Sequence, residues 1–131
     1  MTTKVHFVNF PVAGAAMLQV EILSRAAGGK FAKATEKQLG FPDSLSEYVH
    51  GSQSLMVRHD SDVSSKFLLV NFGPDAVKVD VQVRDPEGKF TDGGEQFIHA
   101  GGYAPFTLHK RHSLQVIEQK AQADGTLKDA E

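Results

Sequence analysis

Eight consecutive residues of this chain, Val77–Arg84, alternate between valine and a polar or charged side chain. Successive side chains of a β-strand point to opposite faces, so a strand would place all four valines on one side. A helix, with 3.6 residues per turn, would spread the valines around its circumference. The segment therefore predicts a strand with one face on a core and the other in water. It constrains the chain to a fold built from sheets.

Further segments of strand character follow one another at short intervals, separated by glycine, proline and aspartate turns. We expect strands over residues 4–10, 16–24, 31–38, 53–58, 67–70, 77–84, 96–99, 106–108 and 113–119. This spacing predicts an all-β chain, a two-sheet antiparallel β-sandwich of immunoglobulin-like or jelly-roll-like type, with a closed barrel as the alternative. We expect eight or nine strands and at most one short helix. Ser44 and Glu47 have capping-box spacing, which places that helical turn at 44–47.

The segment 16–24 leaves two interpretations open. Alanines between residues 13 and 27 favour a helix over 12–27, and Gly28 would cap it. Apolar and polar residues nevertheless alternate, and Ala26–Lys30 has the composition of a hairpin loop. We therefore prefer a strand. In that strand, Leu18, Val20 and Ile22 would face inward. Gln19 and Glu21 would face outward.

The passage from Asn71 through Gly73-Pro74 and the valine strand to Asp85 and Gly88 is similar to the middle hairpin of immunoglobulin-like modules. The chain has no cysteine and no tryptophan, so it lacks the Cys–Trp–Cys core of true immunoglobulin domains. The resemblance therefore implies architecture alone and assigns no functional residue.

Length and composition predict one domain, since 131 residues with 40% hydrophobic side chains suffice for a core. We expect a sandwich over residues 1–120 and a polar tail over 121–131, flexible or docked on a partner. Without cysteine, neither disulfides nor thiolate zinc sites can form. Fourteen basic and sixteen acidic residues give a net charge of −2, which argues against nucleic-acid binding.

The start of the chain predicts no signal peptide, because its apolar run is short and Pro11 interrupts it. No apolar stretch is long enough for a membrane span. We therefore expect a soluble protein that is cytoplasmic or part of a particle assembled in the cytoplasm.

Residues capable of catalysis do not form a recognisable motif. No two of the six histidines have His-x-His spacing, and no Gly-x-Ser-x-Gly elbow is present. The best local group for a metalloenzyme or hydrolase is His59 with Asp60 and Asp62, and it ranks third among our hypotheses. We expect no enzymatic activity, no cofactor and no metal site.

The segment Phe67–Val70 is apolar at every position, so both faces of its strand need cover, either from the chain itself or from a partner. We expect a structural or binding module that self-associates through apolar strand faces, such as a component of a capsid or filament. The partner is then a second copy or a larger protein assembly. The candidate interface residues are Phe7, Phe10, Phe67, Leu69 and Phe72.

The alternative function is binding of a small ligand or a carbohydrate. Tyrosine supplies a flat ring with a polar group, which suits a sugar platform, and Tyr48 and Tyr103 are the two tyrosines of the chain. With His50 and His99, they are the candidate ligand-binding residues.

Overall fold

The computed structural model describes residues 2–9, 18–26, 29–39, 44–58, 65–87, 89–109 and 112–131, apart from the side chains of residues 65, 90 and 92. Within these ranges the only regular elements are eleven strands. They are β1 (Thr3–Asn9), β2 (Leu18–Ser24), β3 (Ala32–Leu39), β4 (Ser44–Val49), β5 (Gln53–Arg58), β6 (Ser65–Gly73), β7 (Val77–Arg84), β8 (Phe90–Ile98), β9 (Tyr103–Leu108), β10 (His112–Ala121) and β11 (Leu127–Asp129).

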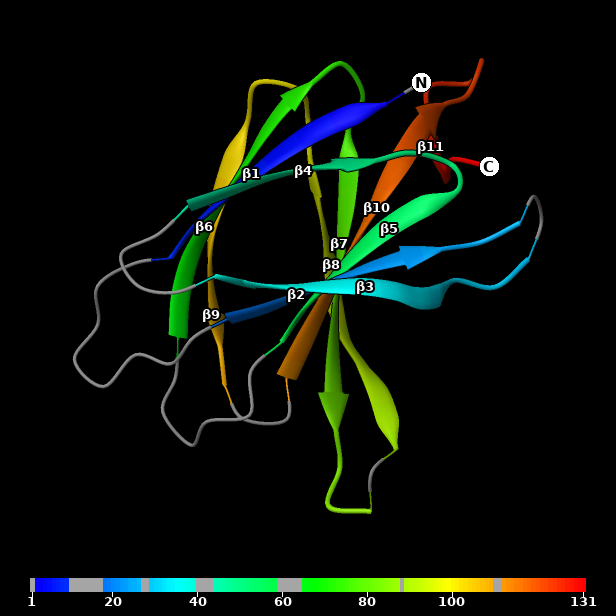
Figure 1. The fold of residues 1–131 in the computed structure, drawn as a ribbon. Coiled ribbons are helices and arrows are strands. Elements are labelled where there is room, and N and C mark those ends of the chain that lie inside the picture. The colour runs from blue at the N-terminus through cyan, green and yellow to red at the C-terminus, as the bar shows by residue number, and fades with distance from the viewer. Residues whose placement is uncertain are drawn as a thin grey trace.

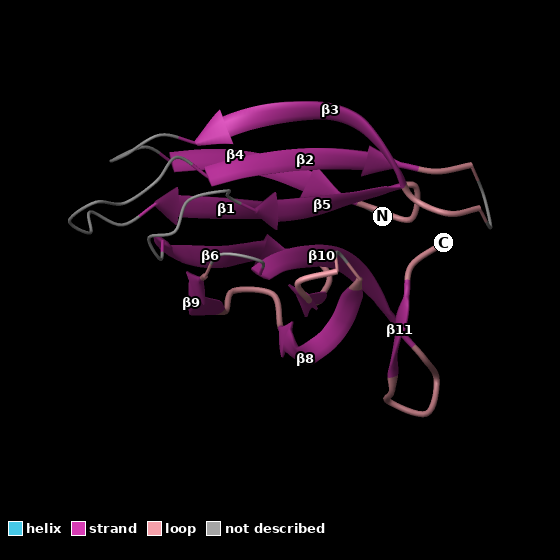
Figure 2. Cartoon of the chain, turned by 90° about the horizontal axis from the view of Figure 1, so that it is seen from below, coloured by secondary structure: helices cyan, strands magenta, loops and turns pink. Residues whose placement is uncertain are grey.

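The strands form two antiparallel sheets, seen from two directions in Figures 1 and 2. Sheet A has four strands in the order β4-β1-β6-β9. Sheet B has six in the order β3-β2-β5-β10-β7-β8, and β11 adds to the end of β10 as a seventh. The predicted two-sheet antiparallel sandwich is thereby confirmed, with more strands than the eight or nine expected.

The core lies between the two sheets and consists of aliphatic side chains with a few phenylalanines. The valine strand behaves as predicted at its start, where Val77 and Val79 are fully buried. Val81 and Val83 are only half-buried, because the hairpin of β7 and β8 extends away from the rest of the molecule (Figure 1). The alternation thus identified the strand and its inward face, while the cover over its second half depends on the other sheet.

The segment over 18–24 is a strand, as preferred, and forms a hairpin with β3. Leu18 and Val20 are buried as expected, but Glu21 is buried too, which corrects its predicted outward exposure. Glu21 does point away from the core, yet an ion pair with Arg58, at 2.5 Å from Nε to Oε1, covers its carboxylate. A register shift at Ile22/Leu23 then turns Leu23 into the buried position.

The helical turn predicted at Ser44–Glu47 is wrong, since these residues form β4 and pair with β1. Their alternation decides the structure: Glu47 and Val49 are buried and Leu45 is half-buried, while Ser44, Ser46 and Tyr48 are exposed. Glu47, the expected capping residue, is instead ion-paired with Lys37 of β3. The capping-box spacing here is a coincidence of sequence that strand pairing overrides.

The polar segment after residue 120, expected as a flexible or partner-docked tail, contains a strand of the same molecule. Its residues 127–129 form β11, which pairs with the end of β10. The end of this segment also packs against the turn between β4 and β5, so a Cβ at Gly51 would lie 2.2 Å from the Glu131 carbonyl carbon. Any side chain at position 51 would therefore displace the segment.

Asn71 joins the end of β6 to the turns on either side of it. Its Nδ2 donates hydrogen bonds to the carbonyl oxygens of Asp75 and Ile98, both at 2.9 Å. Its Oδ1 accepts one from the Gly73 backbone N–H at 2.8 Å. The side chain is fully buried. A buried amide with three such bonds fixes where β6 ends and where the 73–76 turn begins.

Candidate functional site

The strongest candidate for a functional surface is the outward face of sheet A, which we call the outer surface. Strand pairing sets its composition, because directly opposed residues of an antiparallel pair point to the same side. At its centre, His6 and Val8 of β1 pair with Val70 and Leu68 of β6. Leu68 and Val70 pair in turn with Pro105 and Tyr103 of β9. The centre of the outer surface is thus almost wholly apolar.

The most exposed ring on β6 is Phe72, whose side chain is 58% exposed. The His6 ring lies 5.9 Å from it, and the Lys4 ammonium lies 5.8 Å from its centroid. His6 Nδ1 and the Ser46 hydroxyl are hydrogen-bonded at 2.7 Å. These contacts hold a cationic and an aromatic group together at one end of the outer surface.

Two tyrosines flank the outer surface on its edge strands. Tyr103 of β9 is 70% exposed and Tyr48 of β4 is 48% exposed. Three strand spacings separate β4 from β9, which is about 14 Å. The two rings therefore stand at opposite borders of one surface.

The outer surface carries little charge. Among the described residues of sheet A, none of the outward side chains is a carboxylate, and the outward charges are Lys4 and Lys66. Lys4 lies at the start of β1 and Lys66 at the start of β6, which runs antiparallel, so the two lysines lie at opposite ends. An apolar centre with charges at its ends is the usual arrangement of a protein–protein interface.

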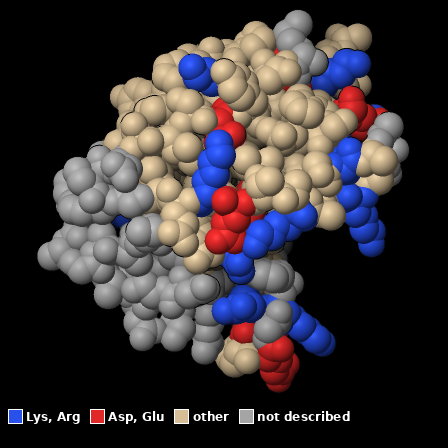
Figure 3. Space-filling view, in the orientation of Figure 1, with Lys and Arg blue, Asp and Glu red and all other residues tan. Residues whose placement is uncertain are grey.

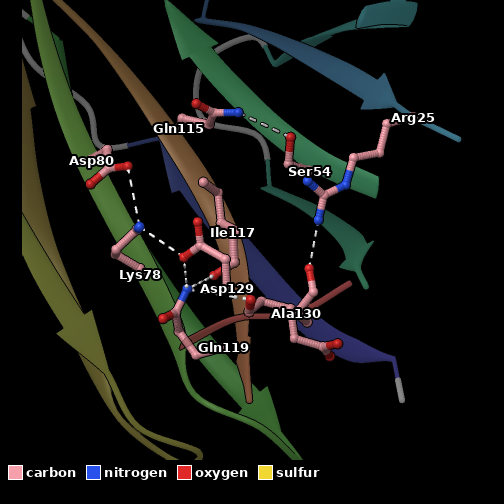
Figure 4. A network of polar contacts seen from close by, with 10 residues as sticks. Arg25, Ser54, Lys78, Asp80, Gln115, Ile117, Gln119, Asp129 and Ala130 are labelled. Carbon is pink, nitrogen blue, oxygen red and sulfur yellow. Dashed lines mark hydrogen bonds and ion pairs between the residues drawn. The ribbon is translucent and has the colours of Figure 1, made fainter. Parts of the chain in front are cut away.

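The outward face of sheet B is different, because ion pairs and hydrogen bonds cover it. Lys78 contacts Asp129 at 2.8 Å and Asp80 at 3.8 Å, and the Arg25 guanidinium donates to the Ala130 carbonyl at 2.6 Å (Figure 4). Figure 3 shows charged side chains of both signs interleaved across the middle of its view, over β3, and a largely uncharged area above them.

Lys78 and Asp129 of sheet B stabilise each other's charged forms. Burial alone raises the pKa of the Asp129 carboxyl, but hydrogen bonds from Lys78 and Gln119 outweigh it and leave the pKa below its usual value. Burial lowers the pKa of the Lys78 ammonium, and the bond to Asp129 and the nearby carboxylates reverse this, so its pKa is raised. Lys78 and Asp129 therefore have their charge partners within the molecule.

The structure corrects part of the predicted interface. Phe7, Phe67 and Leu69 are fully buried in the core, so they are not open to a second chain. The ring of Phe67 lies 6.0 Å from that of Phe7 and 5.6 Å from that of Phe106. Phe72 is exposed on the outer surface, and Phe10 lies outside the described residues.

The predicted ligand-binding residues fall into two groups. Tyr48 and Tyr103 both lie on the outer surface. His50 lies in the turn after β4, where its Nδ1 accepts a hydrogen bond from the Ser52 N–H at 3.2 Å, and His99 lies exposed in the turn after β8. His59, Asp60 and Asp62, the group considered for a metalloenzyme or hydrolase, lie outside the described residues.

Sequence reasoning missed the side chains that make the outer surface apolar, namely Val8, Leu68 and Val70. For Leu68 and Val70 the signal was available, because a strand segment that is apolar at every position has a second apolar face. The sequence does not tell which of the two faces meets the other sheet, and the inward set was chosen in error.

A hollow at one end of the sandwich contains a buried carboxylate. The Glu118 side chain is 2% exposed and accepts a hydrogen bond from the Thr3 hydroxyl at 2.6 Å. Burial raises the pKa of Glu118, although the bond from Thr3 lowers it. With Gly51 and Asp75 it lines a cavity of about 370 Å³. No cluster of three or more His, Cys, Asp or Glu that would suit a metal ion occurs in the described parts of the chain.

Comparison with protein-family models, with curated proteins and with solved structures finds no match to this chain. In the part of the chain that the structure describes, no helix has the length and apolar character that crossing a membrane requires.

Proposed function

We propose that this protein is a non-enzymatic assembly module that self-associates by packing its outer surface against the outer surface of a second copy. The observation that carries the proposal is the contrast between the two sheets. Sheet B carries paired charges on its outward face, whereas sheet A leaves an apolar face with Phe72 and Tyr103 largely exposed. Exposed apolar patches of this kind commonly mark interaction surfaces.

The arrangement of the outer surface favours a second sheet as its partner. Two sheets stack face to face at about 10 Å when their facing side chains are apolar and of moderate size. Val8, Leu68 and Val70 meet that requirement at the centre. The two lysines, one at each end, remain at the border of such a contact and stay in water. A copy of the same surface therefore buries the apolar centre without burying a charge.

The test is the native mass of the protein over a concentration series, measured by light scattering coupled to size exclusion. We expect a concentration-dependent dimer or larger species. Phe72→Ser and Tyr103→Ser should weaken it by about 30-fold each, because burying an exposed aromatic ring against a second copy contributes roughly 2 kcal/mol. Phe97→Ser is the matched control, since Phe97 is an exposed ring on the outward face of sheet B.

A monomer at all concentrations would contradict the proposal. So would an equal loss of association in Phe97→Ser, because that ring does not lie on the outer surface. Denaturation curves of the three variants show whether each still folds.

The alternative, a carbohydrate-binding domain, is favoured by one observation: Tyr48 and Tyr103 flank the same surface. Stacking on tyrosine rings is a common mode of sugar recognition. Binding to a glycan array that is lost on Tyr103→Ala and kept on Phe97→Ala would favour this function over self-association.

A further inference from the structure

Sheet A ends in β4 and β9, and the six-strand order of sheet B ends in β3 and β8. Three of these four strands carry features that block pairing with another chain. β3 presents Lys33, Glu36 and Lys37 along an almost wholly exposed strand. β9 has Pro105 at its middle, which removes a backbone donor. β8 contains Gly93 and Gly94, with φ +117° at Gly94 and a register shift against β7. Charges, proline and bulges are the devices by which proteins protect sheet edges.

The fourth of these edges, β4, has no proline, no bulge and no outward-pointing charge. Its six residues include no proline, glycine, lysine or arginine, and its pairing with β1 runs over all six without a register shift. Its outward side chains, Ser44, Ser46 and Tyr48, are uncharged. Its one charged residue, Glu47, points inward and is ion-paired with Lys37. In the described part of the chain, no strand lies beyond β4.

We propose that β4 pairs antiparallel with β4 of a second copy, so that the two four-stranded sheets A join edge to edge. This contact is separate from the face contact proposed above and does not depend on it. A second copy fits because the pairing opposes no like charges. It also places the outer surfaces of the two copies side by side on one continuous sheet.

The register of this pairing follows from three constraints. Opposed residues must point to the same side, so the two-fold axis passes through a residue and not between two. An axis at Glu47 would oppose two carboxylates, which is unfavourable. Of the remaining positions, Ser46 pairs the greatest length of β4, because it is the other middle residue of the strand. The axis therefore passes through Ser46.

The chain has no cysteine, so introduced cysteines report this register directly. Opposed residues have Cα atoms about 4.5–5.5 Å apart, which is within the range of a disulfide. Ser46→Cys should give a disulfide-linked dimer on oxidation with glutathione disulfide. Ser44→Cys is the matched control on the same strand and face, because its two copies would lie about 14 Å apart. We expect no dimer from it alone, and a dimer when it is mixed with Tyr48→Cys.

Equal cross-linking of Ser46→Cys and Ser44→Cys, or none from either, would overturn the edge contact. The experiment is repeated with Phe72→Ser added, which disrupts the face contact and leaves β4 intact. Cross-linking of Ser46→Cys that is lost there would also overturn the edge contact, because the cysteines would then have met across the face. If cross-linking persists and Phe72→Ser leaves the native mass unchanged, the edge contact is supported and the face contact is contradicted.

Discussion

Phe67 and Phe72 are both on β6, but Phe67 is buried and Phe72 is exposed. Alanine should therefore lower the free energy of unfolding strongly at position 67 and hardly at position 72. Phe67 is fully buried between the rings of Phe7 and Phe106. Removing such a ring costs the transfer free energy and leaves a cavity, together about 3–5 kcal/mol. A domain of this size is stable by about 5–15 kcal/mol, so Phe67→Ala removes a large fraction of the total. Phe72→Ala leaves no cavity and should change monomer stability by less than about 0.5 kcal/mol.

The assay is urea denaturation at a protein concentration low enough to keep the chain monomeric. With a slope of about 2 kcal/mol per molar urea, Phe67→Ala should lower the midpoint by roughly 1.5–2.5 M. Phe72→Ala should shift it by less than roughly 0.3 M. Equal shifts for the two variants would refute the assignment of inward and outward faces on β6, and with it the outer surface.

Two further predictions concern buried polar groups. Asn71→Ala removes three hydrogen bonds and leaves their backbone partners buried. It should therefore lower the free energy of unfolding, measured by denaturation, by about 2–4 kcal/mol. A smaller loss than that caused by Phe72→Ala would contradict the role of Asn71 at the end of β6. Burial raises the pKa of Glu118 in the folded state, so ionisation of this carboxyl opposes folding. The Glu118→Gln variant should therefore gain stability relative to the parent chain as the pH rises above 4.5, the usual pKa of a glutamate. Thermal unfolding of both proteins from pH 4 to pH 8 tests this, and a difference that does not change with pH would disprove it.

The sequence predicts those features that depend on local alternation. β7 and β2 are strands because their apolar residues recur at every second position, and the inward side chains Leu18, Val20, Val77 and Val79 follow from that period alone. The same reasoning would have found β4, where Leu45, Glu47 and Val49 alternate with serine and tyrosine. The capping-box spacing of Ser44 and Glu47 concealed it.

The features that sequence reasoning missed depend on residues far apart in the chain. Glu21 is buried beside Arg58, thirty-seven positions later on the adjacent strand, and beside Lys33 of β3. β11 has three residues, too few for a periodic signal, and exists because the end of β10 has a free position beside it. The choice between the two apolar faces of β6 depends on where sheet B lies, which no local pattern contains.

The proposed edge contact uses the free side of β4, and the proposed face contact uses the outward face of all four strands of sheet A. These two directions determine the symmetry of an assembly that has both contacts. A two-fold axis that relates two copies of β4 runs perpendicular to sheet A, whereas one that relates two stacked outer surfaces runs parallel to it. Two such axes that intersect generate a third and close the assembly at four chains; two that pass each other without meeting generate a filament of unlimited length. The position of Ser46 relative to the centre of the outer surface therefore decides between a closed particle and a fibre.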